Sequence, residues 1–280
     1  MKTFIIIGVL AAVYIVFVII KLMKLNSRAK EIAAKAMKER EQQREKVVED
    51  EPLVSEDGVL SLHDRQYIAC GANLIYLRGE RLDTLETDTE QDEIRHMLRR
   101  DWHINTRDKL LSTIDGLATK GHRIYFKPIW QILTTLPVRE RAEALDKLQQ
   151  DFAAKGDDAP IEQYAANISE CYKHLREVSD CFEGKKCKLD ALTWDLGRAI
   201  NLCRWGYDAG FLSREESMRY IRKFGKELLH NYTSWANLGE NYLIGFAMWT
   251  GDIEQLDELH GGHCDLLSED SSPWVLLESK

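Results

Sequence analysis

The sequence predicts a mostly α-helical protein with a single N-terminal transmembrane helix, a charged helical stalk and one multi-helix cytoplasmic domain. Three observations lead to this fold class. Residues 4–20 form an unbroken apolar run, residues 21–48 are rich in good helix formers and lack Gly and Pro, and helix-capping residues recur through the remainder. We therefore divide the chain into an anchor (residues 1–21), a stalk and linker (residues 22–58) and a globular domain (residues 59–280).

The apolar run is long enough to cross a membrane as a helix, because about 17–25 such residues span the hydrocarbon core. Lys and Arg residues cluster directly after the run, whereas only Lys2 precedes it. The positive-inside rule then predicts a bacterial inner-membrane, single-pass protein with its N-terminus outside and its C-terminal domain in the cytoplasm. A cleaved signal peptide is the alternative, but no small-residue cleavage site follows Ile20.

The charge of the domain argues against nucleic acid as a partner. The chain has 38 Lys and Arg and 46 Asp and Glu residues, of which the first 50 residues contain 10 and 6. Residues 51–280 therefore carry 28 and 40, a net charge of −12. Because an acidic domain is repelled by phosphate backbones, we expect no nucleic-acid partner. The partners that we expect are the membrane, which the anchor enters, and a protein of unknown identity.

Capping residues and glycine stops predict the helices of the domain in order. The expected starts and ends are Thr106 to Gly121, Pro137 to Ala154, Pro160 to Val178, Asp190 to Gly206, Ser213 to His230, Thr233 or Ser234 to Gly251, and Asp252 to Gly261. Strand signals are few, and residues 123–126 and 275–277 are the short candidates. The pattern is that of helices packed on one another.

The most unusual segment begins at Trp194-Asp195-x-x-Arg198 and continues through Trp205-Gly206-Tyr207-Asp208. On a helix, Trp194, Arg198, Asn201 and Trp205 fall along one stripe. A stripe of indoles and a guanidinium is no simple apolar core, because the Arg needs a carboxylate partner or an aromatic face.

This segment resembles the bacterial family catalogued as domain of unknown function 1266, over roughly residues 95–278. Further residues carry the resemblance: Trp102-x-Ile104, Gly121-His122-Arg123, Ala209-Gly210-Phe211, Glu215-Glu216, Ser234-Trp235, Tyr242 with Gly245 and Trp249, and Ser272-Pro273-Trp274. The resemblance implies a mostly helical bacterial domain without an assigned activity, so it transfers no catalytic residues. The anchor and stalk lie outside it.

Three interpretations of the unusual segment stay open. Asp195, Arg198 and Asp208 can form a satisfied polar network that holds helices together. They can also form the site of a membrane-tethered hydrolase, beside His122 or His230. The third interpretation is a binding groove, whose candidate residues are Trp194, Asp195, Arg198, Trp205, Tyr207, Asp208, Trp235, Tyr242 and Trp249.

We expect neither a metal ion nor a cofactor. His260, His263 and Cys264 are the only local group of zinc-type ligands, and the glycines between them are equally typical of a helix end. The six cysteines show no regular spacing, which is typical of free thiols in a reducing compartment. The chain lacks phosphate-binding Gly loops and the common hydrolase and kinase motifs.

These observations favour a membrane-anchored binding protein over an enzyme. The acidic helical domain is expected to contact another protein through the aromatic groove, because Trp, Tyr and Arg dominate interface energetics. One version is an immunity-like or regulatory role against a basic partner. The hydrolase remains the main alternative, and a scaffold that oligomerises through its stalk is the third.

Overall fold

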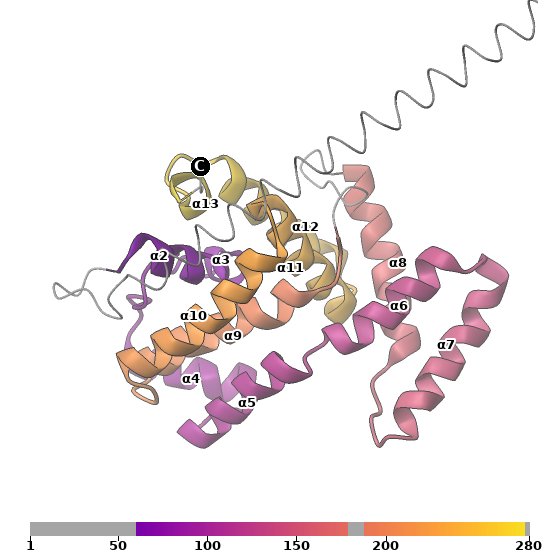
Figure 1. The fold of residues 1–280 in the computed structure, drawn as a ribbon, viewed down its shortest axis with the longest axis horizontal. Helices are drawn as coiled ribbons and strands as arrows, with labels where there is room; N and C mark the ends of the chain where they lie inside the picture. The colour runs from indigo at the N-terminus through magenta and orange to yellow at the C-terminus, as the bar shows by residue number, and fades with distance from the viewer. Residues whose placement is uncertain (1–59, 179–187, 278–280) are drawn as a thin grey trace, which may run out of the picture. The chain divides into compact units, whose positions relative to one another are not determined.

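The structure, a computed structural model, describes residues 60–178 and 188–277 (Figure 1). All regular elements in these ranges are helices, which confirms the mostly α prediction. The helices are α2 (Leu62–Ala69), α3 (Ala72–Tyr76), α4 (Gln91–Trp102), α5 (Arg107–Thr119), α6 (Arg123–Thr135), α7 (Val138–Ala153), α8 (Ile161–Val178), α9 (Leu192–Asp208), α10 (Arg214–Asn231), α11 (Trp235–Thr250), α12 (Ile253–Ser268) and α13 (Pro273–Leu276).

The predicted anchor (residues 1–21) and stalk (residues 22–58) lie outside the described residues. Within residues 60–178 and 188–277, no helix combines the length and the apolar character that a membrane span requires.

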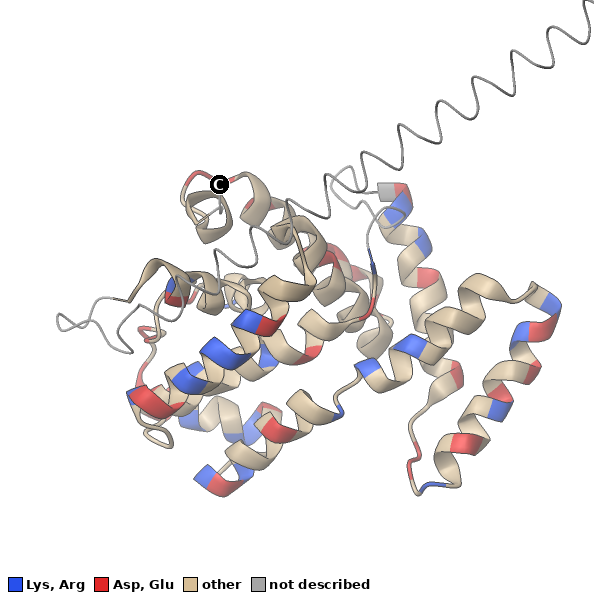
Figure 2. Ribbon diagram, in the orientation of Figure 1, with Lys and Arg blue, Asp and Glu red and all other residues tan. Residues whose placement is uncertain are grey.

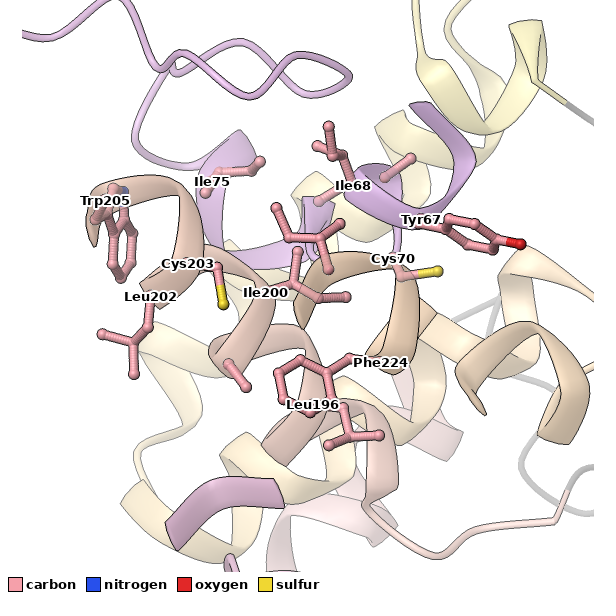
Figure 3. Close-up of a cluster of buried hydrophobic side chains, with 14 of the residues drawn as sticks. Tyr67, Ile68, Cys70, Ile75, Leu196, Ile200, Leu202, Cys203, Trp205 and Phe224 are labelled. Carbon is pink, nitrogen blue, oxygen red and sulfur yellow. The ribbon is translucent and has the colours of Figure 1, made fainter. Parts of the chain in front are cut away.

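Helix α9 is the centre of the described domain. Every residue from Leu192 to Gly206 is buried, and the helix is contacted by α3, α4, α5, α6, α10 and α11. Figure 3 shows Leu196, Ile200 and Cys203 of α9 among buried side chains that include Ile68 and Phe224. A helix enclosed on all sides must find protein partners for its polar side chains, because no water reaches them.

A second core lies between α6, α8 and α11, where Phe126, Ile129, Ile168 and Leu243 are fully buried. Helix α7 packs on α6 and α8 (Figure 1) and contains no buried residue. Lys, Arg, Asp and Glu are interspersed along α7 and α10 (Figure 2). Helix α7 therefore covers the second core with half-buried side chains and presents a mixed charged face.

Four predicted helix starts are confirmed by side-chain hydrogen bonds. Ser213 and Glu216 form a capping box at the start of α10. Thr106, Ser234 and Asp252 accept the expected backbone N–H groups at α5, α11 and α12.

Two local predictions are wrong. The helix that was expected to stop at Gly261-Gly262 continues to Ser268. Gly262 serves packing instead, since a Cβ at this position would lie 2.8 Å from the Tyr76 ring. The two strand candidates are also helical: residues 123–126 begin α6, and residues 275–277 lie at α13 and its C-cap.

Gly245 brings α11 against α9, because a Cβ at this position would overlap the Trp194 side chain. We expect Gly245→Ala to destabilise the protein by about 1–3 kcal/mol, as overpacked cores do. The matched control is Gly261→Ala, where a Cβ meets nothing within 4 Å and should stabilise the helix by up to about 1 kcal/mol. Urea unfolding of the two variants measures the difference, and equal midpoints would contradict the packing argument.

Candidate functional site

The Asp195 carboxylate joins α9 to the junction between α5 and α6. It is fully buried in the first turn of α9. It accepts the backbone N–H groups of His122 (2.8 Å) and Arg123 (3.0 Å), the Arg123 Nη1 (3.0 Å) and the Arg198 Nη2 (3.0 Å). Because the first N–H groups of a helix lack intrahelical acceptors, Asp195 caps α6 from another helix.

Gly121 is needed at this junction for two reasons. Its φ is +56°, in the left-handed region that favours glycine. A Cβ at this position would also overlap the Asp195 carboxylate. The glycine therefore allows the backbone to approach the carboxylate closely enough to donate to it.

Arg198 lies one turn after Asp195 and is 8% exposed. Its Nε donates to the Trp194 carbonyl oxygen (2.7 Å), and its Nη2 donates to Asp195 and lies 3.0 Å from the Nδ1 of His122. The guanidinium carbon lies 3.8 Å from the centre of the Trp194 ring. Burial lowers the Arg198 pKa and the Asp195 charge opposes that shift. Two charges and an aromatic face thus stabilise one another inside the protein.

His122 is held neutral, and its hydrogen-bond partners define its tautomer. Nδ1 lies 3.1 Å from the Trp194 Nε1 and 3.0 Å from the Arg198 Nη2, and both of these groups can only donate. Nδ1 therefore accepts, and the ring proton is on Nε2. Burial, followed by the Arg198 charge, lowers the His122 pKa to about 4, against the effect of Asp195. A ring in this state offers an N–H donor and is poorly suited to act as a general base.

Aromatic rings surround this polar network. Trp194 contacts Tyr242 (5.1 Å between ring centroids), Phe246 (5.8 Å) and Trp249 (6.0 Å) of α11. Trp249 is 52% exposed, while Phe246 is half-buried. The His122 ring also contacts the rings of Tyr125 and Tyr164, which are both half-buried. We call this group the aromatic cluster; its members are His122, Tyr125, Tyr164, Trp194, Phe246 and Trp249.

Asp208 does not join the network of Asp195 and Arg198. It lies about 20 Å along α9 from Asp195, at 1.5 Å per residue, where it accepts the backbone N–H (2.9 Å) and hydroxyl (2.6 Å) of Thr87. Burial raises its pKa, and the Thr87 hydrogen bonds oppose this. The three residues of the hydrolase hypothesis are therefore not brought together.

The other groove candidates lie at two further places. Near the C-terminal end of α9, the buried Trp205 donates to the Glu80 carboxylate (3.0 Å), and Tyr207 is half-buried against the first core. Trp235 stacks on Trp274, with 5.6 Å between ring centroids. Of the nine candidates, Trp194, Asp195, Arg198, Tyr242 and Trp249 lie together.

Sequence reasoning missed part of the site. Arg123, Tyr125, Tyr164 and Phe246 were not candidates, and His122 was considered only as a possible base. Gly121-His122-Arg123 carried a signal through the family resemblance, whereas nothing in the spacing of Tyr125 and Tyr164 connects them with α9.

His263 and its neighbours were considered as metal ligands. Across the described ranges, no group of three or more His, Cys, Asp or Glu side chains could hold a metal ion. His263 is fully buried, and neither of its ring nitrogens has a hydrogen-bond partner among the described residues. Cys264 is disulfide-bonded, so the expectation of six free thiols is wrong for this residue. Cys70, Cys171 and Cys203 are free and buried.

Comparison with known proteins places the chain in a family. Residues 97–278, which include α5 to α13 and the whole site, match the family described as protein of unknown function DUF1266. The chain belongs to the DUF1266 family. It is also 26% identical over 151 residues to the uncharacterized protein YbeR of Escherichia coli strain K12, a match that covers 53% of this chain and 54% of YbeR. The chain thus spans about half the length of that relative, and no solved structure matches it.

The four hydrogen bonds to Asp195 predict a large loss of stability in Asp195→Asn. The amide cannot balance two guanidinium groups, and we expect a cost of about 3–5 kcal/mol, as for other broken buried pairs. Asp101→Asn is the control, because Asp101 pairs with Arg100 at the surface and should cost no more than about 1 kcal/mol. Urea unfolding at neutral pH compares them. Similar losses in both variants would show that Asp195 does not organise the junction.

The burial of His263 predicts that the folded protein loses stability in acid. Burial lowers its pKa from 6.5 to about 3, so the unfolded chain binds the proton more strongly than the folded chain does. Stability is full above pH 6.5 and falls as the pH drops toward 3, with a slope of up to about 1.4 kcal/mol per pH unit. His263→Gln removes this titration and should flatten the pH dependence of the unfolding free energy. Gly261→Ala changes no titratable group and should keep the wild-type slope; an unchanged slope in His263→Gln would contradict the assignment.

Proposed function

We propose that the domain is a binding module that contacts another protein through the aromatic cluster. The observation that carries this proposal is the exposure of Trp249 beside Trp194 and Phe246. Tryptophan is enriched among the residues that dominate binding free energies, because a large ring becomes buried at little cost in side-chain entropy. An exposed tryptophan on a rigid aromatic base is suited to that role.

The polar network supports binding over hydrolysis. Each Asp195 oxygen already accepts two hydrogen bonds, and the Nδ1 of His122 is occupied by donors. A general base must have a free lone pair near the substrate. Both groups are therefore used to hold the surface in shape, which leaves the hydrolase hypothesis without a base at this position.

We further propose that residues 4–20 anchor the protein in the bacterial inner membrane and that the domain lies in the cytoplasm. The apolar run and the cationic residues that follow it support this placement. The disulfide bond of Cys264 argues against a cytoplasmic location, because disulfides are rare in reducing compartments. A C-terminal reporter that is active only inside the cell would support the cytoplasmic side, and one active only outside would reverse the orientation.

Site-specific photo-crosslinking in cells tests the binding role. Benzoylphenylalanine in place of Trp249 should give a discrete crosslinked species, since this position is expected to be buried by the partner. Val138 on α7 is the matched control position, because it is 76% exposed and apolar but is not a member of the aromatic cluster. We expect no discrete product at position 138. Absence of a product at 249, or the same products at both positions, would argue against a partner at the aromatic cluster.

A further inference from the structure

Hydrogen-bond donors outnumber acceptors beside the aromatic cluster. Arg198 has five N–H groups, of which Nε–H and the two on Nη2 are directed at Trp194, Asp195 and His122. The Nη1 group has no acceptor anywhere in the described part of the chain. The side chain nevertheless retains 9% exposure, so solvent reaches it.

Other donors lie beside Arg198. The half-buried His122 faces Arg198 with its Nδ1, so its Nε2–H points away from the guanidinium. Tyr164 is also half-buried, and its ring meets the His122 ring edge-on at 6.2 Å. Burial, followed by the charge of Asp157, raises the Tyr164 pKa, and the Arg198 charge opposes this shift. The hydroxyl of Tyr242, sealed inside the core, has no acceptor among the described residues either. The Nη1 group of Arg198 and the Tyr164 hydroxyl are thus accessible donors without a described acceptor, whereas the Tyr242 hydroxyl is sealed.

The nearby acceptors are already occupied. Asp195 accepts four hydrogen bonds, and Asp157 accepts the Tyr125 hydroxyl at 2.7 Å. The described residues therefore supply no acceptor for these donors. Because solvent reaches them, water can accept their hydrogen bonds until a ligand acceptor replaces it.

We propose that the Nη1 group of Arg198 and the hydroxyl of Tyr164 form a carboxylate-binding subsite at the edge of the aromatic cluster. Guanidinium groups bind carboxylates through charge-assisted hydrogen bonds. The negative charge of Asp157 acts on Tyr164 and disfavours a dianion such as phosphate. The exposed Trp249 would contact the apolar group that carries the carboxylate.

The inference rests on the proposed function only in taking the domain as a binding module. The carboxylate can belong to a free small molecule or to the C-terminus of a protein. Benzoate represents the first source, and acetyl-Gly-Phe represents the second. Benzamide and acetyl-Gly-Phe-amide are the uncharged controls, and inorganic phosphate is the dianion control.

Titration of the full-length protein with these probes, followed by tryptophan fluorescence and by the nitrogen resonances of the His122 ring, tests the subsite. We expect saturable binding of at least one acid in about the millimolar range, as is typical of fragments, and no binding of its amide. The Nδ1 resonance of His122 should shift, because Nδ1 lies 3.0 Å from the Arg198 Nη2. Preference for acetyl-Gly-Phe would assign the site to a protein terminus, and preference for benzoate to a small molecule. Equal binding of acid and amide, tighter binding of phosphate, or no saturable binding would overturn the proposal.

Tyr164→Phe removes one donor and keeps the ring. It should weaken binding of the acid about fivefold, the loss expected for one hydrogen bond. Tyr220→Phe is the control, because Tyr220 is also half-buried but lies on α10, outside the aromatic cluster, and its affinity should equal that of the wild type. Unchanged affinity in Tyr164→Phe would overturn the assignment. The outcome is independent of crosslinking at position 249, so failure of the subsite and failure of the protein-binding role are distinguishable.

Discussion

The described domain depends on one buried carboxylate. Asp195 accepts the first N–H groups of α6 and pairs with two arginines, so α9, the α5–α6 junction and the aromatic cluster have fixed relative positions. A charge without these partners would not be tolerated at full burial. The same contacts set the His122 tautomer and the position of the Trp194 ring. The carboxylate thus acts as a structural centre whose effect reaches the surface at Trp249.

A similar arrangement repeats near the other end of α9. Arg204 is fully buried and donates to the carbonyl oxygens of Thr84, Arg81 and Glu86, in a segment without regular secondary structure. Asp208 binds Thr87 of the same segment. Charged side chains of the central helix therefore satisfy backbone groups that no helix or sheet satisfies, which explains how an irregular segment can lie against a buried helix.

The sequence predicted helices better than it predicted the site. Caps such as Ser213 and Ser234 act within four residues, so a local pattern contains the necessary information. The prediction of a strand at residues 123–126 was wrong. The start of α6 there is capped by the carboxylate oxygens of Asp195, which is more than seventy residues away in the sequence. The stripe of Trp194 and Arg198 was recognised by helical spacing, but the direction it faces depends on how α6 and α11 dock. Tyr164 was missed because its position beside α9 also depends on how the helices dock. Asp208 was grouped with Asp195 because helical spacing alone does not show that α9 carries two separate polar networks.

The unequal burial of α7 and α9 has a consequence for motion. A helix without buried residues contributes little to the cooperative core, so its amide hydrogens should exchange with solvent through local opening, whereas those of α9 require global unfolding. Phe152 of α7 covers the ring of Tyr125, with 5.0 Å between centroids. Each opening of α7 would uncover Tyr125, so the area of aromatic surface available to a partner fluctuates while the Asp195 centre remains intact.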